Sequence, residues 1–496
     1  MYKRVLALVL SLMLVSLSAL SLAEGTFSMA GYDAEDSHNW ANNHALERIE
    51  ERSGVHFTYN QYTDTEEWTN AKKAMTKDSA DLPDVLFKAS LTQDEAQELY
   101  DRGVLIDLRP YLEEYAPNLS ALLKEHPDWE SAITLADGAI VALPNLNPLQ
   151  NNNALWINTV WLNNLHLSVP TTAEELTEVL RAFKTGDPNK NGKKDEIPLT
   201  FIGMWDLRWL GHAFGIYSND YYVTLEDGTV RQTVTTDENR AFLTWLHQLW
   251  EEELIDHDGF SSTTSSKQIT DSSSDITYGI VMGASVMDML PTEQLDNYDV
   301  LLPLTYNGKQ VYRKLLGDVS YGTFAVTSAC SDPAAMVAWV DFFYTEEGCY
   351  LTQAGEKDSE YEVYSDGSWH WLAEATEISE TILPDYTIAS GTLMPGYTPV
   401  EYQLLYDDTQ TQRAVKQLAS LNEYSVYPCP MLALTTEARA RLNELWPALG
   451  TYCETMMARF VSGDVALNDT TWAEFCAEAE RLGLSEMVSI WQSAVK

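Results

Sequence analysis

A short stretch with the side chains of a metal site runs DPNKNGKKDE over residues 187–196. Oxygen-bearing side chains stand at its first, third, fifth and ninth positions, and the seventh offers a backbone carbonyl, which is the ligand order of a calcium-binding loop. Gly192 follows the fifth position and provides the positive φ with which the chain turns around the ion. All donors are oxygen atoms, which favours Ca²⁺ over Zn²⁺. The predicted ligands are Asp187, Asn189, Asn191, the carbonyl of Lys193, Asp195 and Glu196.

The loop departs from a complete EF-hand at its end. Pro198 stands where an EF-hand carries a bidentate glutamate, and Glu196 is the natural replacement. A helical pattern precedes the loop and the extended segment IPLTFI follows it, so the ion would stiffen a helix-to-strand connection. The alternative is a polar turn rich in Asn and Gly that needs no ion. Because this arrangement leaves no carboxylate over for catalysis, we interpret the predicted Ca²⁺ as structural.

Recognisable catalytic motifs are missing from the sequence. It contains no G-x-S-x-G, H-E-x-x-H, P-loop or G-x-G-x-x-G pattern, and its 9 histidines are scattered. With 74 Asp and Glu residues, a carboxylate pair at glycosidase spacing is neither excluded nor identified. The sequence therefore favours a binding protein over an enzyme.

Aromatic residues offer a surface for sugars. The chain has 15 Trp and 26 Tyr, and aromatic rings stack on the apolar faces of sugar rings while polar side chains bind the hydroxyl groups. Core packing is the commoner role of a tryptophan, so the best candidates lie in polar turns or near predicted strand ends. With polar residues at two such ends, the predicted ligand contacts are Tyr32, Asp33, Trp40, Lys88, Ser90, Trp156, Trp205, Trp209, Tyr321, Trp369 and Trp371.

The N-terminal part of the chain has the rhythm of a parallel sheet. TFSMA (26–30), VHFTYNQY (55–62) and LPDVLF (82–87) are typical of strands, and helix-spaced apolar residues separate them. This β-α-β-α-β order implies right-handed crossovers and a ligand beyond the carboxyl ends of the strands. Residues 31–33 and 88–90 stand at two such ends.

A second unit begins near residue 147. Thr172 precedes a predicted helix with one apolar face over residues 176–183, and this helix leads into the 187–196 loop. Asp227-Gly228 is predicted to be a hairpin turn. The C-terminal segment, roughly the last 100 residues, is predicted to be mostly helical.

The net charge argues against one large class of partner. The sequence has 31 Lys and Arg against 74 Asp and Glu, a net charge of −43. Such a surface repels phosphate backbones and anionic lipid, so no nucleic-acid partner is expected. With 45% hydrophobic residues the chain is globular, and its 496 residues predict two or three compact units.

The N-terminus predicts export. A basic start at Lys3-Arg4 precedes an apolar run over residues 5–22, and small residues up to Ala23 fit a cleavage site, so residues 1–23 resemble a secretory signal peptide. An uncleaved membrane anchor is the alternative, because the run is long enough to span a bilayer. The 5 cysteines lie far from this region and have no C-x-x-C spacing, which supports neither a lipid anchor, a zinc site nor a disulfide scaffold.

Two long segments carry a family resemblance. LWINTVWLNNLHLSVPTTAEELTEVLRAFKTGDPNKNGKKDEIPLT (155–200) resembles the central segment of family 1 extracellular solute-binding proteins of bacterial ABC transporters, where a tryptophan-rich start, a "vPtT" helix and a "DpngNGkkDEiPl" calcium loop follow in this order. GDVSYGTFAVTSACSDPAAMVAWVDFFYTEEGCYLTQAGE (317–356) resembles the family's strand, turn, "P-e-a-a" helix and "s-e-E-G" block. The calcium loop is characteristic of the oligosaccharide-binding branch. The family's "G-x-e-G-x-x-Y" turn is matched only at Gly355 and Tyr361, and the lipidation cysteine of many members is not found.

The resemblance implies an α/β fold of the periplasmic-binding-protein-like type II, with two lobes joined by a hinge and a ligand cleft between them. It places lobe 1 in residues 24–146 plus about 313–350, and lobe 2 in residues 147–312 plus about 351–496. It further implies an extracytoplasmic monomer that captures an oligosaccharide by lobe closure and delivers it to membrane permease subunits. The implied ion is a structural Ca²⁺ in the matched loop.

Two other functions stay open on the sequence. One is a secreted carbohydrate-active enzyme, hydrolase or lyase, with a structural calcium. The other is a peptide-binding or sensor protein of the same fold. The charge of −43 mildly disfavours a polyanionic glycan, although Lys88, Arg208 and Arg313 could line a basic cleft.

Overall fold

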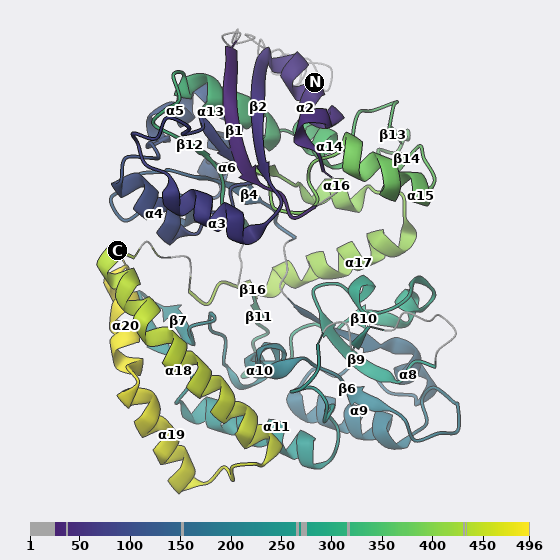
Figure 1. Cartoon of the computed structure of the whole chain (residues 1–496). Coiled ribbons are helices and arrows are strands. Elements are labelled where there is room, and N and C mark those ends of the chain that lie inside the picture. Colours follow the sequence, from purple (N-terminus) through teal and green to yellow (C-terminus); the bar gives the residue numbers. More distant parts are fainter. Residues whose placement is uncertain are drawn as a thin grey trace, which may run out of the picture.

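The chain folds into two α/β lobes, drawn one above the other in Figure 1. Each lobe is built around its own sheet and its own buried apolar core. The predicted signal peptide, residues 1–23, lies outside the residues that the structure describes. The computed structural model describes residues 25–35, 38–149, 153–263, 267–268, 275–314, 318–429, 432 and 434–495.

Lobe 1, the upper lobe in Figure 1, contains a six-stranded sheet. Its strand order is β15 (Gly396–Tyr397), β4 (Leu143–Leu146), β12 (Val319–Val326), β3 (Val85–Phe87), β1 (Gly25–Tyr32) and β2 (Val55–Tyr62). β1 pairs in parallel with both β2 and β3, as the β-α-β-α-β rhythm predicted. β12 runs antiparallel between β3 and β4, so a strand from late in the sequence sits inside the sheet.

Helices cover both faces of this sheet. A second, smaller two-stranded sheet, β13 (Tyr361–Val363) with β14 (Trp369–Trp371), packs at one side. The helices of lobe 1 are η1 (Trp40–Asn42), α2 (His44–Ser53), α3 (Thr65–Ala74), α4 (Gln93–Asp101), α5 (Arg109–Tyr115), α6 (Pro117–Glu125), α7 (Pro127–Ile133), α13 (Pro333–Asp341), η5 (Phe342–Tyr344), α14 (Glu346–Gln353), α15 (Ala375–Glu377), η6 (Ile378–Tyr386) and α16 (Val400–Leu404).

Lobe 2 contains a four-stranded sheet and a separate hairpin. The sheet order is β10 (Tyr298–Val300), β5 (Ala154–Asn158), β9 (Tyr278–Gly283) and β6 (Ile197–Leu199), and the hairpin joins β7 (Val223–Glu226) to β8 (Thr229–Gln232). Its helices are α8 (Thr159–Asn164), α9 (Ala173–Thr185), α10 (Gly203–Leu207), η2 (Arg208–Phe214), α11 (Asp237–Glu251), η3 (Val286–Asp288), η4 (Thr292–Asn297), α17 (Thr409–Ser420), η7 (Leu421–Tyr424), α18 (Thr436–Ser462), α19 (Asp469–Arg481) and α20 (Leu484–Ser493).

Local sequence rules account for the elements around the predicted calcium loop. Thr172 caps α9 by accepting a hydrogen bond from the backbone N–H of Glu175, and the predicted apolar face over residues 176–183 is buried in the core of lobe 2. The hairpin turn at Asp227 and Gly228 has φ values of 47° and 76°, as a two-residue turn with two left-handed residues requires. Both predictions are confirmed, as is the helical C-terminal segment.

The later half of lobe 1 differs from the predicted lobe boundaries. The sequence analysis assigned residues from about 351 onward to lobe 2, but β15 pairs with β4 in the sheet of lobe 1. Leu351, Ile388 and Met394 are buried in the core of lobe 1. A two-residue strand has no periodicity by which the sequence could reveal it, so the return of the chain into lobe 1 was missed.

A buried lysine links the connections between the lobes. The chain passes from β4 to β5, from β11 (Tyr312–Arg313) to β12, and from α16 to α17, and β11 pairs with β16 (Ser425–Val426) near these passages. The Lys314 ammonium donates hydrogen bonds to the carbonyl of Pro148 at 2.8 Å, to the carboxylate of Asp318 and to Oδ1 of Asn422 at 3.5 Å. Pro148 belongs to the first connection, Asp318 to the second, and Asn422 follows the third. We call this region the hinge.

Among the described residues, no helix combines the length and the apolar character that crossing a membrane requires.

Replacing the hinge lysine tests this arrangement. We expect Lys314→Met to lower the free energy of unfolding by about 3 kcal/mol, because Asp318 keeps its charge in a mostly buried place and loses its cationic partner. Urea denaturation followed by tryptophan fluorescence measures the change. The matched control is Lys309→Met, since Lys309 is exposed in the same part of the chain. Equal denaturation midpoints for the two variants would contradict the assignment.

Candidate functional site

The carboxyl edges of the two sheets face the hinge. In lobe 1, β1, β3 and β4 run in one direction, and the chain leaves for lobe 2 where β4 ends. In lobe 2, the start of β5 lies beside the end of β9, because Ala154 pairs with Gly283, and β6 runs parallel to β9. Ligands of open α/β sheets bind beyond the carboxyl ends of parallel strands. The space between the lobes is therefore the candidate ligand cleft.

A cavity of about 430 Å³ opens between the lobes on the side of α18. Lobe 1 contributes one face of α4 and residues 134–136, and lobe 2 contributes Leu434 and the first turns of α18. Its volume is within the usual range of small-ligand sites, about 300–1,000 Å³. Described residues of both lobes thus line one open cavity.

Polar contacts join the lobes beside this cavity. The Arg439 guanidinium on α18 pairs with Asp94 Oδ1 on α4 at 2.6 Å and donates a hydrogen bond to Oε1 of Gln93 at 2.8 Å. One turn further along α18, Asn443 Nδ2 donates to Asp94 Oδ2 at 2.9 Å. Both oxygens of Asp94 are therefore engaged by the opposite lobe.

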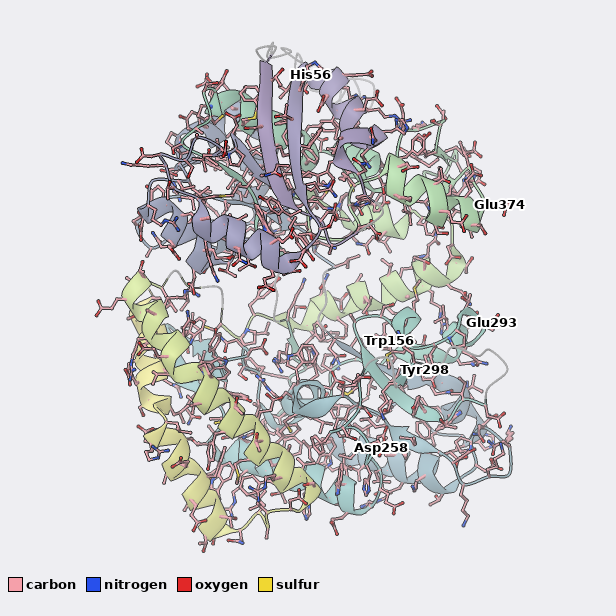
Figure 2. The ribbon with its side chains drawn as sticks, viewed as in Figure 1. His56, Trp156, Asp258, Glu293, Tyr298 and Glu374 are labelled. Carbon is pink, nitrogen blue, oxygen red and sulfur yellow. The ribbon has the colours of Figure 1, made fainter. Side chains whose placement is uncertain are left out.

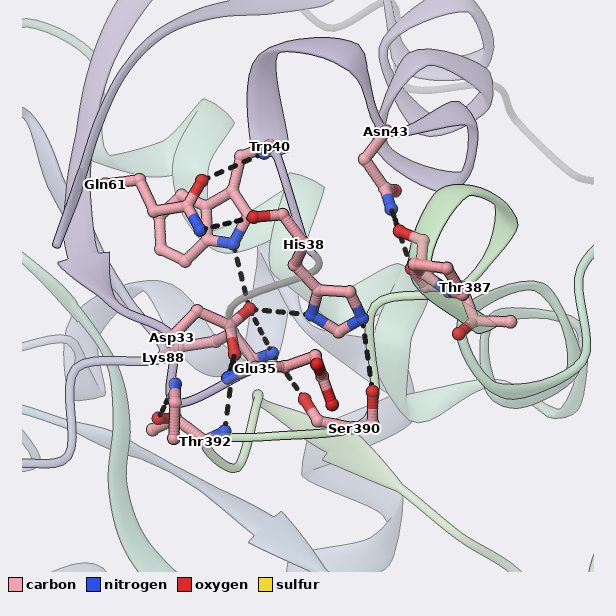
Figure 3. Close-up of polar contacts among 12 residues, drawn as sticks. Asp33, Glu35, His38, Trp40, Asn43, Gln61, Lys88, Thr387, Ser390 and Thr392 are labelled. Carbon is pink, nitrogen blue, oxygen red and sulfur yellow. Dashed lines mark hydrogen bonds and ion pairs between the residues drawn. The ribbon is translucent and has the colours of Figure 1, made fainter. Parts of the chain in front are cut away.

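The predicted ligand residues at the ends of β1 and β3 form a buried network (Figure 3). The Asp33 carboxylate pairs with the Lys88 ammonium at 2.6 Å, and it also contacts Nδ1 of His38 at 2.9 Å and accepts a hydrogen bond from Nε1 of Trp40 at 3.0 Å. Lys88 further donates to the carbonyl of Ser390 at 2.7 Å. Asp33 and Lys88 are fully buried and Trp40 nearly so. These three residues fasten the segment after η6 to the sheet, and we correct their predicted role as sugar contacts.

Burial and pairing set the ionisation of this network. Burial raises the pKa of Asp33, but hydrogen bonds from His38, Lys88 and Trp40 and the charge of Lys88 lower it, and the net pKa is below its ordinary value. Burial lowers the pKa of Lys88 to about 8, against the opposing charge of Asp33. Each charge therefore depends on the other to remain in the interior.

Three predicted tryptophan contacts also lie in the protein interior. Figure 2 shows Trp156 inside lobe 2 beside Tyr298, and its Nε1 donates to the carbonyl of Gly283 at 3.2 Å. Trp369 is buried and donates to the carbonyl of Tyr402 at 2.8 Å. Trp209 is buried with its ring 4.4 Å from that of Trp205 and 4.3 Å from the Arg313 guanidinium. The core-packing role, which is the commoner one, applies to all three.

The other predicted contacts keep part of their surface accessible. Tyr32, Trp205, Tyr321 and Trp371 are half-buried, and Ser90 is exposed. At the carboxyl edge of lobe 1, Tyr32 is the last residue of β1 and Ser90 follows β3. Tyr321 lies near the start of β12 at the same edge. The Tyr321 hydroxyl is buried, and no described residue forms a hydrogen bond with it. Burial raises the pKa of Tyr321, and the charge of Arg439 from the opposite lobe opposes this rise.

Two arginines of lobe 2 lie together near the hinge. The Arg313 guanidinium approaches Asp220 at 3.3 Å, and Arg208 approaches the same carboxylate at 3.8 Å. Burial lowers the pKa of Arg313, the like charge of Arg208 lowers it further, and Asp220 opposes both. Nε of Arg313 is buried and has no hydrogen-bond partner in the part of the chain that the structure describes. Arg208 and Arg313 are thus neighbours, as a basic lining would need, whereas Lys88 is buried in the other lobe.

Side-chain hydrogen bonds hold the 187–196 loop together. The side-chain amides of Asn189 and Asn191 both turn toward the Asp195 carboxylate, at 3.5 and 3.2 Å, and the Asp187 carboxylate accepts from the N–H of Gly192. Gly192 has a φ of 72°, the left-handed conformation predicted for it.

The last acid of the loop is held in the interior. Glu196 is buried, and its Oε1 has no hydrogen-bond partner among the described residues. Burial raises the pKa of Glu196, and the negative charges of Asp195 and Asp187 raise it further. Among the described residues, no three His, Cys, Asp or Glu side chains gather closely enough to hold a metal by themselves. A cation here would therefore also need the Asn oxygens and the Lys193 carbonyl.

Several residues of the cleft region gave no signal in the sequence. His38 and Ser390 complete the Asp33 network, and Arg439 reaches a residue of lobe 1 that precedes it by more than 300 positions. Neither group belongs to a motif. Only pairing information between distant positions could have found them.

A hinged pair of lobes with sheet edges facing a shared cleft is the architecture of a substrate-binding protein. The chain matches the model of the family "Bacterial extracellular solute-binding protein" over residues 35–348, and it belongs to that family. The family and the relatives below are substrate-binding proteins of ABC transporters and not enzymes.

The relatives extend over nearly the whole chain. FusA of Streptococcus pneumoniae, a fructooligosaccharide ABC transporter substrate-binding protein, is 27% identical over 90% of this chain and 85% of its own. Its structure in complex with kestose covers 95% of this chain and 98% of its own at a TM-score of 0.72 and 24% identity. A structure of its EF-hand mutant with fructo-nystose has a TM-score of 0.71 at 24% identity, with the same coverage of both chains. An HMO-binding solute-binding protein of Bifidobacterium longum infantis has a TM-score of 0.81 at 20% identity, and the match covers 95% of this chain and 99% of its own. These likenesses establish the predicted type II periplasmic-binding fold.

Removing one charge of the buried network tests its structural role. We expect Asp33→Asn to lower the free energy of unfolding by about 3–5 kcal/mol at pH 7, because Lys88 is left buried without its counter-charge. The double variant Asp33→Asn with Lys88→Met should recover a large part of this loss, since no buried charge is then unpaired. Chemical denaturation of the wild type, of Asp33→Asn and of the double variant measures their free energies of unfolding. A double variant no more stable than Asp33→Asn would show that the pair is not what holds this region.

Proposed function

We propose that this chain is the extracytoplasmic binding protein of an ABC importer and that its ligand is an oligosaccharide. The observation that carries the proposal is the likeness to FusA over 90% of the chain, because FusA is a fructooligosaccharide-binding protein of this kind. The half-buried rings of Tyr32 and Tyr321 in lobe 1 and of Trp205 in lobe 2 support it. Such rings offer apolar faces to sugar rings from both sides of a cleft.

Ligand capture follows from the two-lobed architecture. An oligosaccharide that contacts both sheet edges stabilises the arrangement in which the lobes approach, and the equilibrium shifts by the difference in its affinity for the two arrangements. The hinge around Lys314 allows the lobes to move as rigid bodies. The membrane permease would then distinguish the closed from the open protein, and release of the sugar would complete one cycle.

We further propose that the mature protein is exported by the N-terminal segment over residues 1–23 and acts as a monomer outside the cytoplasm. The apolar run after Lys3-Arg4 supports export.

We propose Ca²⁺ as the ion of the 187–196 loop. The donors fit it, because they are all oxygen atoms and because the buried Glu196 Oε1 has no hydrogen-bond partner within the described ranges. Asp187, Asn189, Asn191, the Lys193 carbonyl, Asp195 and Glu196 would hold the ion. A bound Ca²⁺ would neutralise the crowded carboxylates and stiffen the connection from α9 to β6. The relative FusA was studied as an EF-hand mutant, which supports a calcium-binding loop in this chain as well.

Thermal unfolding with candidate ligands tests the sugar assignment. The panel contains kestose, nystose, lacto-N-tetraose, an alginate trisaccharide, a galacturonate trisaccharide and a tripeptide mixture. A bound sugar at 100 times its Kd should raise Tm by about 5 °C, because it binds only the folded state. A neutral or an acidic sugar that responds would also name the ligand class. If only the tripeptides raise Tm, or if no compound in the panel does, the oligosaccharide assignment is wrong.

Calcium removal tests the loop. We expect EGTA to lower Tm by about 5 °C and excess Ca²⁺ to restore it, because the ion stabilises only the folded loop. Glu196→Gln should bring the same loss and make the protein insensitive to EGTA. Glu174→Gln is the matched control, since Glu174 is exposed on the helix that precedes the loop. If EGTA leaves the wild-type Tm unchanged, the loop is a polar turn without an ion.

A further inference from the structure

The contact between α4 and α18 lies apart from the hinge and joins the two lobes directly. At the hinge the lobes are held by Lys314 and by the pairing of β11 with β16. The α4–α18 contact depends on side chains alone, from Arg439 and Asn443 on one lobe and from Asp94 and Gln93 on the other. Any movement that separates α4 from α18 breaks all of its hydrogen bonds together.

The geometry of this contact is specific. Arg439 and Asn443 are one helical turn apart and reach the same carboxylate, so they approach Asp94 from one face of α18. Asp94 lies in the first turn of α4, where the helix dipole favours a negative charge. Gln93 accepts a second hydrogen bond from Arg439. Three side-chain contacts thus fix how the first turn of α4 sits against α18.

We propose that Arg439, Asn443, Asp94 and Gln93 form a latch that sets ligand affinity by holding the lobes together rather than by contacting the ligand. They are positioning residues for capture. This inference rests on the proposed function, in which the ligand binds between the lobes. A bias toward the closed arrangement changes the apparent affinity of every ligand of that cleft by the same factor.

The strength of the latch follows from its exposure. The side chains of Arg439 and Asp94 are 22% and 40% exposed, and the cavity of about 430 Å³ lies next to them. Water and salt therefore reach the pair, and its contribution is that of a good surface ion pair. We expect its loss to weaken ligand binding about fivefold, and high ionic strength to have a similar effect on the wild type.

The decisive experiment needs no ligand. Small-angle scattering and amide hydrogen exchange are measured on the mature protein, on Arg439→Ala and on Asp94→Asn. The matched control is Arg441→Ala, because Arg441 stands on the same helix and pairs with Glu444 and Glu486 within lobe 2. We expect both latch variants to have a larger radius of gyration and faster exchange in the first turn of α4, and the control to match the wild type. If both latch variants have the same radius of gyration and the same exchange rates as the wild type, the proposal is overturned.

An affinity measurement separates the latch from a ligand contact. Isothermal titration uses kestose and any other sugar of the panel that raises Tm, with wild type, Arg439→Ala and Arg441→Ala. An equal loss for each sugar supports the latch. A loss confined to one sugar, with unchanged scattering, makes Arg439 a ligand contact and overturns the proposal. If no sugar binds while the latch variants still expand, the latch stands and the oligosaccharide assignment fails.

Discussion

One buried ammonium group organises the relation between the lobes. Lys314 is bonded to groups from the connections that run between them, and its charge is balanced by Asp318 at the start of the return into lobe 1. Because an unpaired charge in this place would cost several kcal/mol, the connections are kept together at a single point. The sheet edges on either side can then change their separation while their own strands stay paired. Because α4 and α18 lie to one side of this point, rotation of the lobes about it changes the distance between these two helices.

The charged residues at the cleft edge of lobe 1 stabilise the fold and are not free to contact a ligand. Asp33 and Lys88 satisfy each other in the interior and anchor the backbone at Ser390, which belongs to a segment far along the chain. The surface left for a ligand is formed by the half-buried Tyr32 and Tyr321 and by the exposed Ser90. In lobe 2, Arg208 and Arg313 remain close together with one shared carboxylate. The two edges are therefore chemically different, with tyrosine rings and a serine on one and guanidinium groups near the other.

The sequence predicted those parts whose cause is local. The capped helix before residue 187, the hairpin at Asp227 and the parallel strands of lobe 1 follow from spacing and turn chemistry. Site residues were predicted less well, because Asp33, Lys88 and several tryptophans were judged by type and by place along a strand. Burial depends on which distant segment packs over a residue, as Ser390 does over Lys88, and one sequence carries no record of that pairing. The same limit hid the return of β15 into lobe 1.

The position of β12 has a consequence for how the protein is made. In lobe 1, β3 and β4 become neighbours of a common strand only when residues 319–326 are inserted between them. All strands of the lobe 2 sheet lie earlier in the chain, between Ala154 and Val300. During synthesis lobe 2 can therefore complete its sheet while lobe 1 still has two open edges, with backbone groups free to pair with another chain. The sheet that is begun first is therefore finished last, and aggregation of a nascent chain would start at those edges.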